Sequence, residues 1–192
     1  MVEGKHGLTA ATPDNIAFGA GTIHKGLKYT EGTGWNYAAS LVGATSGGSK
    51  LSIVPEIYRP AIDGVPGNVK GLAKKIDEKA SMEVNFAELT PDMIKAAVYA
   101  TVGTSADNTL DVYEPKADIT DDDYWENIAF GGETLGGKKI IAILDNVLCT
   151  SGFDTEFKNR ESMVGKYTFE CHVDPSTDMA TMPWHIYYPK AV

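Results

Sequence analysis

The stretch KKIDEKASMEVNFAEL, residues 74–89, carries the clearest structural pattern in the chain. Its apolar residues fall on alternate positions: Ile76, Ala80, Met82, Val84 and Phe86. Charged and polar residues fill the positions between them: Asp77, Lys79, Ser81, Glu83 and Asn85. A period of two places these sets on opposite faces of an extended chain. We therefore predict a long strand with one buried and one solvated face.

A helix is predicted directly after this strand, over residues 91–101. Thr90 suits the N-cap, Pro91 the first helical position, and Asp92 the positive end of the helix dipole. The apolar stripe consists of Met93, Ala97 and Ala100, flanked by Ile94 and Val98. Gly103 is predicted to end the helix.

The segments before this strand predict two more strands and a long loop. NIAFGAGTIHKGL (15–27) indicates a strand interrupted by glycines, and ATSGGSKLSIVPEIY (44–58) a turn at Gly47 and Gly48 followed by a strand. RPAIDGVPGNVKG (59–71) is rich in Gly and Pro, which favours a turn-rich excursion. Loops of this length in compact proteins are usually functional or disordered.

The second half of the chain is also dominated by strand patterns. ITDDDYWENIAF (119–130) and KKIIAILDNVLC (138–149) predict a hairpin turning at GGETLGG (131–137), while SMVGKYTFECHV (162–173) and WHIYY (184–188) predict two later strands. Seven or eight strands and one helix indicate a mainly β fold. We expect a single domain over residues 1–192, an antiparallel β-sandwich or barrel with one flanking α-helix.

Composition excludes some classes of function. The 192 residues carry a formal net charge of −9, which argues against a surface that grips DNA. Cys149 and Cys171 lie in alternating segments, so buried free thiols are expected. The longest apolar run, IIAIL (140–144), is far too short to span a membrane. Without a charged-then-apolar leader, synthesis in the cytoplasm and no membrane partner are expected.

One motif resembles a nucleotide-binding loop. GETLGGKK (132–139) fits most of a P-loop, but a strand is predicted after it where a P-loop needs a helix. Lys139 also replaces the Ser or Thr that holds magnesium. A second Thr-x-Gly-Gly-x-Lys stretch begins at Thr45, again before a strand. A turn used twice explains both copies better than a cofactor site, and no cofactor is expected.

Other candidate sites also favour structural explanations. DPSTD (174–178) begins like a calcium loop, but Met179 and His185 stand where an EF-hand needs Gly and Glu, so a turn is predicted. The run Asp121–Asp123 is expected to be a solvated loop. No nucleophile motif such as G-x-S-x-G occurs, and the four histidines are scattered. We predict no catalytic residue, no metal ligand and no enzymatic activity.

The excursion and the two ends of the chain do not serve an obvious core, and such segments often dock on neighbouring subunits. Four stretches then reveal a resemblance: NIAFGAG (15–21), IVPEIYRPAIDGVPGNVKGLAKKID (53–77), KASMEVNFAEL (79–89) and YTFECHVDPSTDMATMPWHIYY (167–188). Together they resemble the major tail tube proteins of long-tailed bacteriophages, of the siphophage type infecting Gram-positive hosts. The resemblance spans almost the whole chain.

The resemblance implies a virion structural protein that polymerises as stacked hexameric rings into a hollow tail tube. Its implied partners are copies of itself, the tape-measure protein, the tail terminator and distal tail proteins, and DNA passing through the lumen. An N-terminal arm (1–13), an inter-ring loop (59–72) and a C-terminal extension (175–192) correspond to the assembly segments of the family. The implied inter-ring contacts are Arg59, Asp63, Val65, Asn68 and Lys70.

A DNA conduit should be lined by acidic and neutral side chains, because cations would bind phosphates and slow transit. The candidates for the lumen are Glu56, Asp77, Glu83 and Asn85. Lys79 shares their face and does not fit a DNA conduit unless a neighbouring carboxylate pairs with it. The alternative is that this face points outward to solvent.

Two other functions remain open. The chain could be the tube subunit of a contractile tail or a phage-tail-like particle, in which case a sheath gene would lie beside its own. It could also be a carbohydrate-binding β-sandwich, since such modules show surface Trp and Tyr. Nothing aligns Trp125, Trp184 and Tyr187 on one strand face, however, and we expect them in the core or at an interface.

Overall fold

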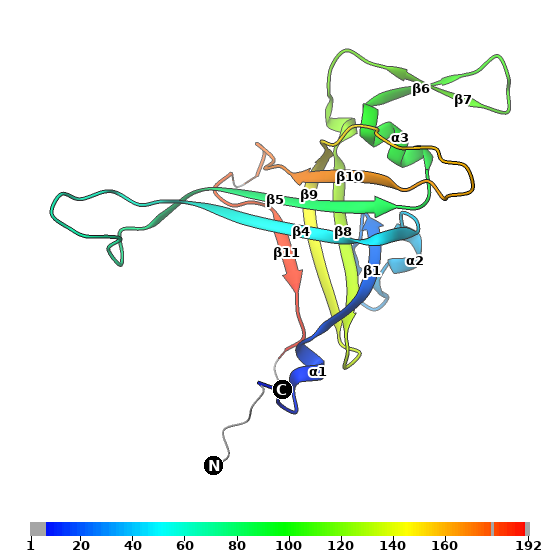
Figure 1. Cartoon of the computed structure of the whole chain (residues 1–192). Helices are drawn as coiled ribbons and strands as arrows, with labels where there is room; N and C mark the ends of the chain where they lie inside the picture. The colour runs from blue at the N-terminus through cyan, green and yellow to red at the C-terminus, as the bar shows by residue number, and fades with distance from the viewer. Residues whose placement is uncertain (1–6, 178, 191–192) are drawn as a thin grey trace.

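The computed structural model describes residues 7–177 and 179–190 and is mainly β, with antiparallel pairing throughout. Its large sheet has seven strands in the order β1-β8-β9-β10-β5-β4, with β11 pairing with β9 (Figure 1). These strands are β1 (Ala17–Lys25), β4 (Thr45–Tyr58), β5 (Lys74–Phe86), β8 (Trp125–Thr134), β9 (Lys139–Cys149), β10 (Gly165–Cys171) and β11 (Trp184–Tyr187).

Smaller elements surround this sheet. Two separate two-stranded sheets are formed by β2 (Tyr29–Thr30) with β3 (Gly34–Trp35) and by β6 (Ala100–Thr104) with β7 (Asp111–Pro115). The helices are α1 (Thr12–Asn15), α2 (Tyr37–Ser40), α3 (Pro91–Val98) and the 3-10 turn η1 (Asp121–Asp123). The sequence patterns predicted only the longest of these helices and none of the four short strands. None of the helices in the described part of the chain has the length and apolar character needed to cross a bilayer.

The long alternating strand is confirmed as β5. Ala80, Met82, Val84 and Phe86 are buried, and the residues between them stay partly open to solvent. Ile76 departs from the prediction, since it is 55% exposed. It lies on the outer half of β5, which runs past the core and, among the described residues, pairs only with β4 (Figure 1).

The predicted turn at Gly47 and Gly48 is wrong. Both residues lie inside β4 with φ of +84°, and the β4–β5 register shifts between Thr45 and Ser49. This is a β-bulge, in which extra residues on one strand bend the ladder. The similar motif near Lys138 is a true turn, because the Gly137 amide donates to the Thr134 carbonyl at 2.9 Å before β9 begins.

The predicted helix forms, but it is shorter than expected. The Thr90 side chain accepts the Met93 amide at 3.4 Å, as an N-cap should. The helix ends at Val98 because Tyr99 adopts a left-handed conformation with φ of 50°. Ala100 and Thr101 therefore belong to β6, not to the helix. The Tyr99 hydroxyl donates to the Cys149 carbonyl, which fixes this exit from the helix.

The main core lies between α3 and the inner faces of several strands. It contains Ile23, Ala80, Met82, Val84, Phe86, Met93, Ala96, Ala97, Trp125, Ile128, Leu144, Val147, Cys149, Tyr167, Phe169 and Cys171. A second cluster, Leu27, Ala129, Ile141 and Ile143, lies against Trp35 and Tyr37. Strand β9 thus buries residues of both parities, which explains its unbroken apolar run. Both cysteines are buried free thiols, as predicted, and burial raises the pKa of Cys171 to about 12.

The two ends of the chain are anchored to the sheet where they are described. The Gly136 amide donates to the Pro13 carbonyl at 3.0 Å, and Asp14 pairs with Lys138 at 2.9 Å. The C-terminal extension contributes β11, which pairs with β9 from Trp184 to Tyr187. Residues 1–6, 178 and 191–192 of these two segments lie outside the described residues.

Candidate assembly surface

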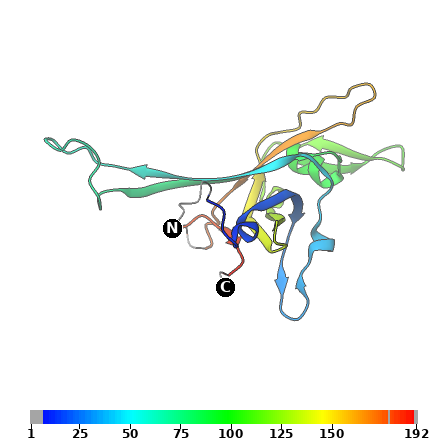
Figure 2. The same cartoon turned by 60° about the horizontal axis from the view of Figure 1, so that its bottom comes forward.

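A long β-hairpin, the arm, extends from one side of the molecule and consists of residues 54–79 (Figures 1 and 2). Strands β4 and β5 pair along it from Val54 opposite Lys79 to Tyr58 opposite Lys74. On the side of Ala80 toward Lys74, the hairpin leaves the core. The predicted inter-ring loop, 59–72, forms the end of this arm, and its turns need glycine because Gly64, Gly67 and Gly71 have positive φ.

The arm exposes an unusual amount of apolar surface. Its large hydrophobic residues are Val54, Ile57, Tyr58, Ile62, Val65, Val69, Leu72 and Ile76, and each is at least 40% exposed. Large exposed apolar surface marks interaction sites in soluble proteins. Because these eight residues lie close together on one hairpin, we treat them as a single candidate docking surface.

The tip of the arm is also basic. Residues 59–75 contain four cations, Arg59, Lys70, Lys74 and Lys75, and one anion, Asp63, which gives a formal net charge of +3. The chain as a whole carries −9, so the remainder carries −12. Only Lys75 of these cations forms an ion pair within the described residues, with Glu78 at 3.1 Å.

All five predicted inter-ring residues lie on this tip and are exposed: Arg59, Asp63, Val65, Asn68 and Lys70. The structure therefore places them together and away from the core, while their contact with a neighbouring ring stays a prediction.

The root of the arm is held by a contact between distant parts of the chain. The Trp184 indole donates from Nε1 to Glu78 Oε2 at 2.9 Å, which joins β11 to β5. The indole and Lys75 stabilise the carboxylate, so the pKa of Glu78 is lowered from its ordinary value. This contact ties the root of the arm to β11.

The four lumen candidates share one face of the β4–β5 ladder but differ in surroundings. Glu56 and Asp77 are directly opposite each other on the arm, and both are exposed. Glu83 lies on the body of the sheet, where Lys50 and Lys166 contact it at 2.9 and 3.1 Å. These two lysines lower the pKa of Glu83 and offset its charge.

The other members of this face are polar or uncharged. Asn85 donates to the Gly48 carbonyl at 3.2 Å, across the bulge. Lys79 lies opposite Val54 and forms no ion pair among the described residues, so the carboxylate expected beside it is not found there. The face is thus polar with balanced charge, and only its arm half is acidic, through Glu56 and Asp77.

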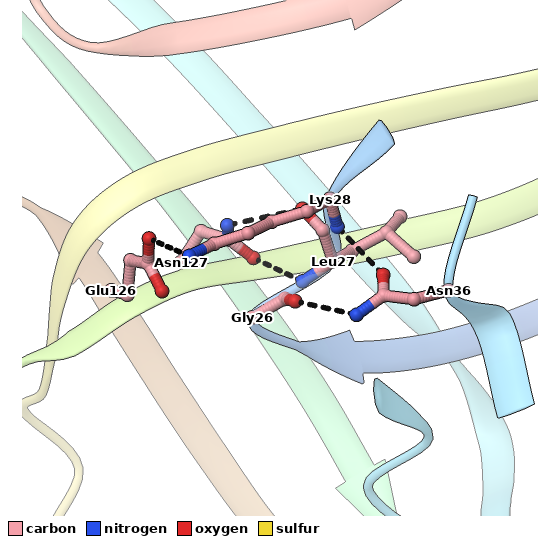
Figure 3. Close-up of polar contacts among 6 residues, drawn as sticks. All are labelled: Gly26, Leu27, Lys28, Asn36, Glu126 and Asn127. Carbon is pink, nitrogen blue, oxygen red and sulfur yellow. Dashed lines mark hydrogen bonds and ion pairs between the residues drawn. The ribbon is translucent and has the colours of Figure 1, made fainter. Parts of the chain in front are cut away.

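A second exposed hairpin, β2–β3, is anchored by two asparagines (Figure 3). Asn127, 5% exposed, accepts the Leu27 amide at 2.9 Å and donates to the Leu27 carbonyl at 3.2 Å. Asn36 accepts the Lys28 amide at 2.7 Å and donates to the Gly26 carbonyl at 3.2 Å. Each side-chain amide thus pairs with backbone as a neighbouring strand would. No sequence pattern indicated these roles.

A buried histidine lies beside a groove of about 640 Å³ lined by Phe18, Tyr37 and Leu41. His24 contacts Ser40 Oγ at 3.0 Å through Nδ1 and Thr22 Oγ1 at 2.8 Å through Nε2. Burial lowers its pKa. Its second nitrogen meets a hydroxyl, whereas a Ser-His-Asp triad places a carboxylate there. The arrangement joins β1 to α2 and does not reproduce a catalytic triad.

The remaining predicted aromatics are divided between core and surface. Trp125 is buried against Phe169, and Tyr187 contacts Trp35 with ring centroids 5.1 Å apart. The Asp174 segment forms the predicted turn, because Asp174 Oδ1 accepts the Ser176 amide at 2.8 Å. Among the described residues, no three His, Cys, Asp or Glu side chains gather closely enough to hold a metal ion.

No protein-family model matches the chain, and no curated protein matches it.

Proposed function

We propose that this chain is a virion structural protein that polymerises as stacked hexameric rings into a hollow tail tube through which phage DNA passes. The arm is the observation that carries the proposal. Burial of apolar area is the main force in protein association, and the arm holds its apolar residues away from its own core. An arm of this kind is suited to reach a subunit in the next ring.

The arrangement of the strands supports ring formation. The core between α3 and the strands is consistent with the sandwich-like barrel proposed for the subunit. Strand β4 forms a ladder only with β5 in the described structure, so its other edge is open to a strand from a neighbour except where it approaches β1. Joining such edges around a ring would satisfy backbone groups that otherwise favour aggregation. In this proposal the polar face of β4 and β5 lines the lumen.

The proposed partners are copies of the chain, the tape-measure protein during assembly, and the terminator and distal proteins at the two ends of the tail. DNA passes through without specific binding, which a chain of net charge −9 favours. The proposed location is the tail of the virion, after synthesis in the cytoplasm of the host.

Removing the end of the arm tests this proposal. Deleting Gly64–Asn68 should leave a folded monomer that makes no tubes, because these residues are exposed and contribute nothing to the core. The matched control deletes Lys158–Ser162, five residues of another exposed loop. Circular dichroism checks folding, and negative-stain electron microscopy of concentrated protein scores tubes. Tubes of normal length from the arm deletion would contradict the proposal.

A further inference from the structure

A second exposed region has the opposite charge to the tip of the arm. Residues 104–122, the acidic hairpin, comprise the end of β6, the β6–β7 turn, strand β7 and the segment that leads into η1. They contain one cation, Lys116, and six anions: Asp107, Asp111, Glu114, Asp118, Asp121 and Asp122. The formal net charge of this segment is therefore −5.

These carboxylates are not neutralised within the molecule. Lys116 is already paired with the buried Asp123, at 2.5 Å. None of the six anions forms an ion pair within the described residues. Apolar side chains lie among them and are also open to solvent, with Leu110 60% and Ile119 48% exposed. The region thus combines negative charge and apolar surface, and the tip of the arm, residues 59–75, combines positive charge and apolar surface.

The two regions project from opposite ends of the molecule. In both views the arm extends to one side and the β6–β7 hairpin to the other (Figures 1 and 2). The arm therefore cannot reach the acidic hairpin of its own chain. Two different, complementary surfaces at opposite ends produce head-to-tail association, which continues from copy to copy.

We infer that the acidic hairpin of one subunit is the docking site for the arm of the next. The inference rests on the proposed function, to which it adds the identity of the receiving surface. Lys70 and Lys74 supply positive charge at the arm tip, and Asp111 and Asp118 receive it. Complementary charges steer the encounter and exclude the wrong polarity, since arm against arm or hairpin against hairpin places like charges together. The apolar residues of both regions supply the buried area.

Mixed-isotope crosslinking tests the contact directly. The full chain is prepared at natural abundance and with ¹⁵N, mixed at high concentration, and treated with a carbodiimide that joins lysine to carboxylate with loss of water. We expect isotope-mixed crosslinks between residues 70–75 and residues 104–122. Crosslinks from the arm confined to other carboxylates would overturn the inference.

Charge reversal supplies the matched test. The arm variant Lys70→Glu/Lys74→Glu and the hairpin variant Asp111→Lys/Asp118→Lys should each associate at least about tenfold more weakly than the wild type, because like charges now meet. Mixing the two variants should restore association, since the arm of each variant is then opposite in charge to the hairpin of the other. The control Glu31→Lys/Glu88→Lys changes the net charge by +4, as the hairpin variant does, at exposed sites elsewhere and should assemble normally.

The outcomes separate this inference from the proposed function. Loss of assembly in the arm variant with normal assembly in the hairpin variant would overturn the inference and leave the tube proposal standing. Failure of the mixture to recover association would also overturn it. Wild-type protein that forms neither assemblies nor isotope-mixed crosslinks would count against both. Sedimentation velocity measures association, and circular dichroism confirms that each variant is folded.

Discussion

At the scale of single residues, Asn127 shows how one polar side chain can replace a strand. Its carboxamide meets both backbone groups of Leu27, at a point where the chain leaves β1 and turns toward β2 (Figure 3). Gly26 has a φ of 66°, so the backbone here cannot continue a regular ladder. A buried backbone amide and carbonyl need partners, and the asparagine provides both.

Replacing this residue should be costly. Asn127→Ala leaves the buried Leu27 amide and carbonyl without these partners, and we expect a loss of about 2–4 kcal/mol in the free energy of unfolding. The matched control is Asn108→Ala, an exposed position, which should change stability by less than about 0.5 kcal/mol. Urea unfolding followed by circular dichroism measures both. Equal stability of the two variants would show that the carboxamide is dispensable.

At the scale of elements, the glycine pair in β4 sets the direction of the arm. Gly47 and Gly48 form a bulge next to Asn85, before the ladder resumes at Ser49. A bulge bends its strand and increases its twist. The bulge therefore influences how the rest of β4 leaves the body of the sheet.

A substitution in this bulge should act through backbone conformation alone. A Cβ at Gly48 would meet no atom within 4 Å, but the φ of +84° is unfavourable for any other residue. We expect Gly48→Ala to destabilise the protein by about 1–2 kcal/mol. Gly103→Ala is the control, because its φ is ordinary and the nearest atoms lie 3.8 Å from the new Cβ, so its stability should stay near the wild-type value. Thermal unfolding compares the two, and equal melting temperatures would exclude strain at the bulge.

Elements with strong local signals were predictable, and elements made by tertiary contacts were not. The alternation in β5 and the capping residues of α3 identified both elements, because period and caps are local properties. The early end of α3 depends on Tyr99 bonding to Cys149, fifty residues away in sequence. Likewise Lys50 and Lys166 meet Glu83 from two other strands. The candidate surface was predicted as a loop, but its form as a projecting hairpin follows from pairing between β4 and β5.

At the scale of the whole molecule, the two ends of the subunit differ and carry opposite charges. The arm, with its basic tip, and the acidic hairpin project from opposite ends (Figure 2). A subunit of this form favours repetition along one axis over closed pairs, because each end complements the other and not itself. This property is consistent with the tube proposal. Charge complementarity between subunits also predicts that high salt weakens association.

The proposed lumen gives the last prediction, and it concerns the assembled tube. Glu83 is clamped by Lys50 and Lys166, so reversing it would disturb two ion pairs as well as the charge of the face. Asp77→Lys with Ser81→Lys adds positive charge to the same face without breaking an ion pair of the described structure. Phage carrying this variant should assemble tails and eject DNA several-fold more slowly, because lysines on the lumen would bind passing phosphates.

The control for that experiment is Glu31→Lys with Thr30→Lys, which adds the same charge on the exposed β2–β3 hairpin. Ejection is followed by the fluorescence of a DNA dye after triggering with receptor. If both variants eject at the wild-type rate, the polar face of β4 and β5 does not line the lumen. If both are slow, added charge alone disturbs the tube, and the lumen assignment loses its support. Slow ejection confined to the Asp77 and Ser81 variant would place this face on the path of the DNA.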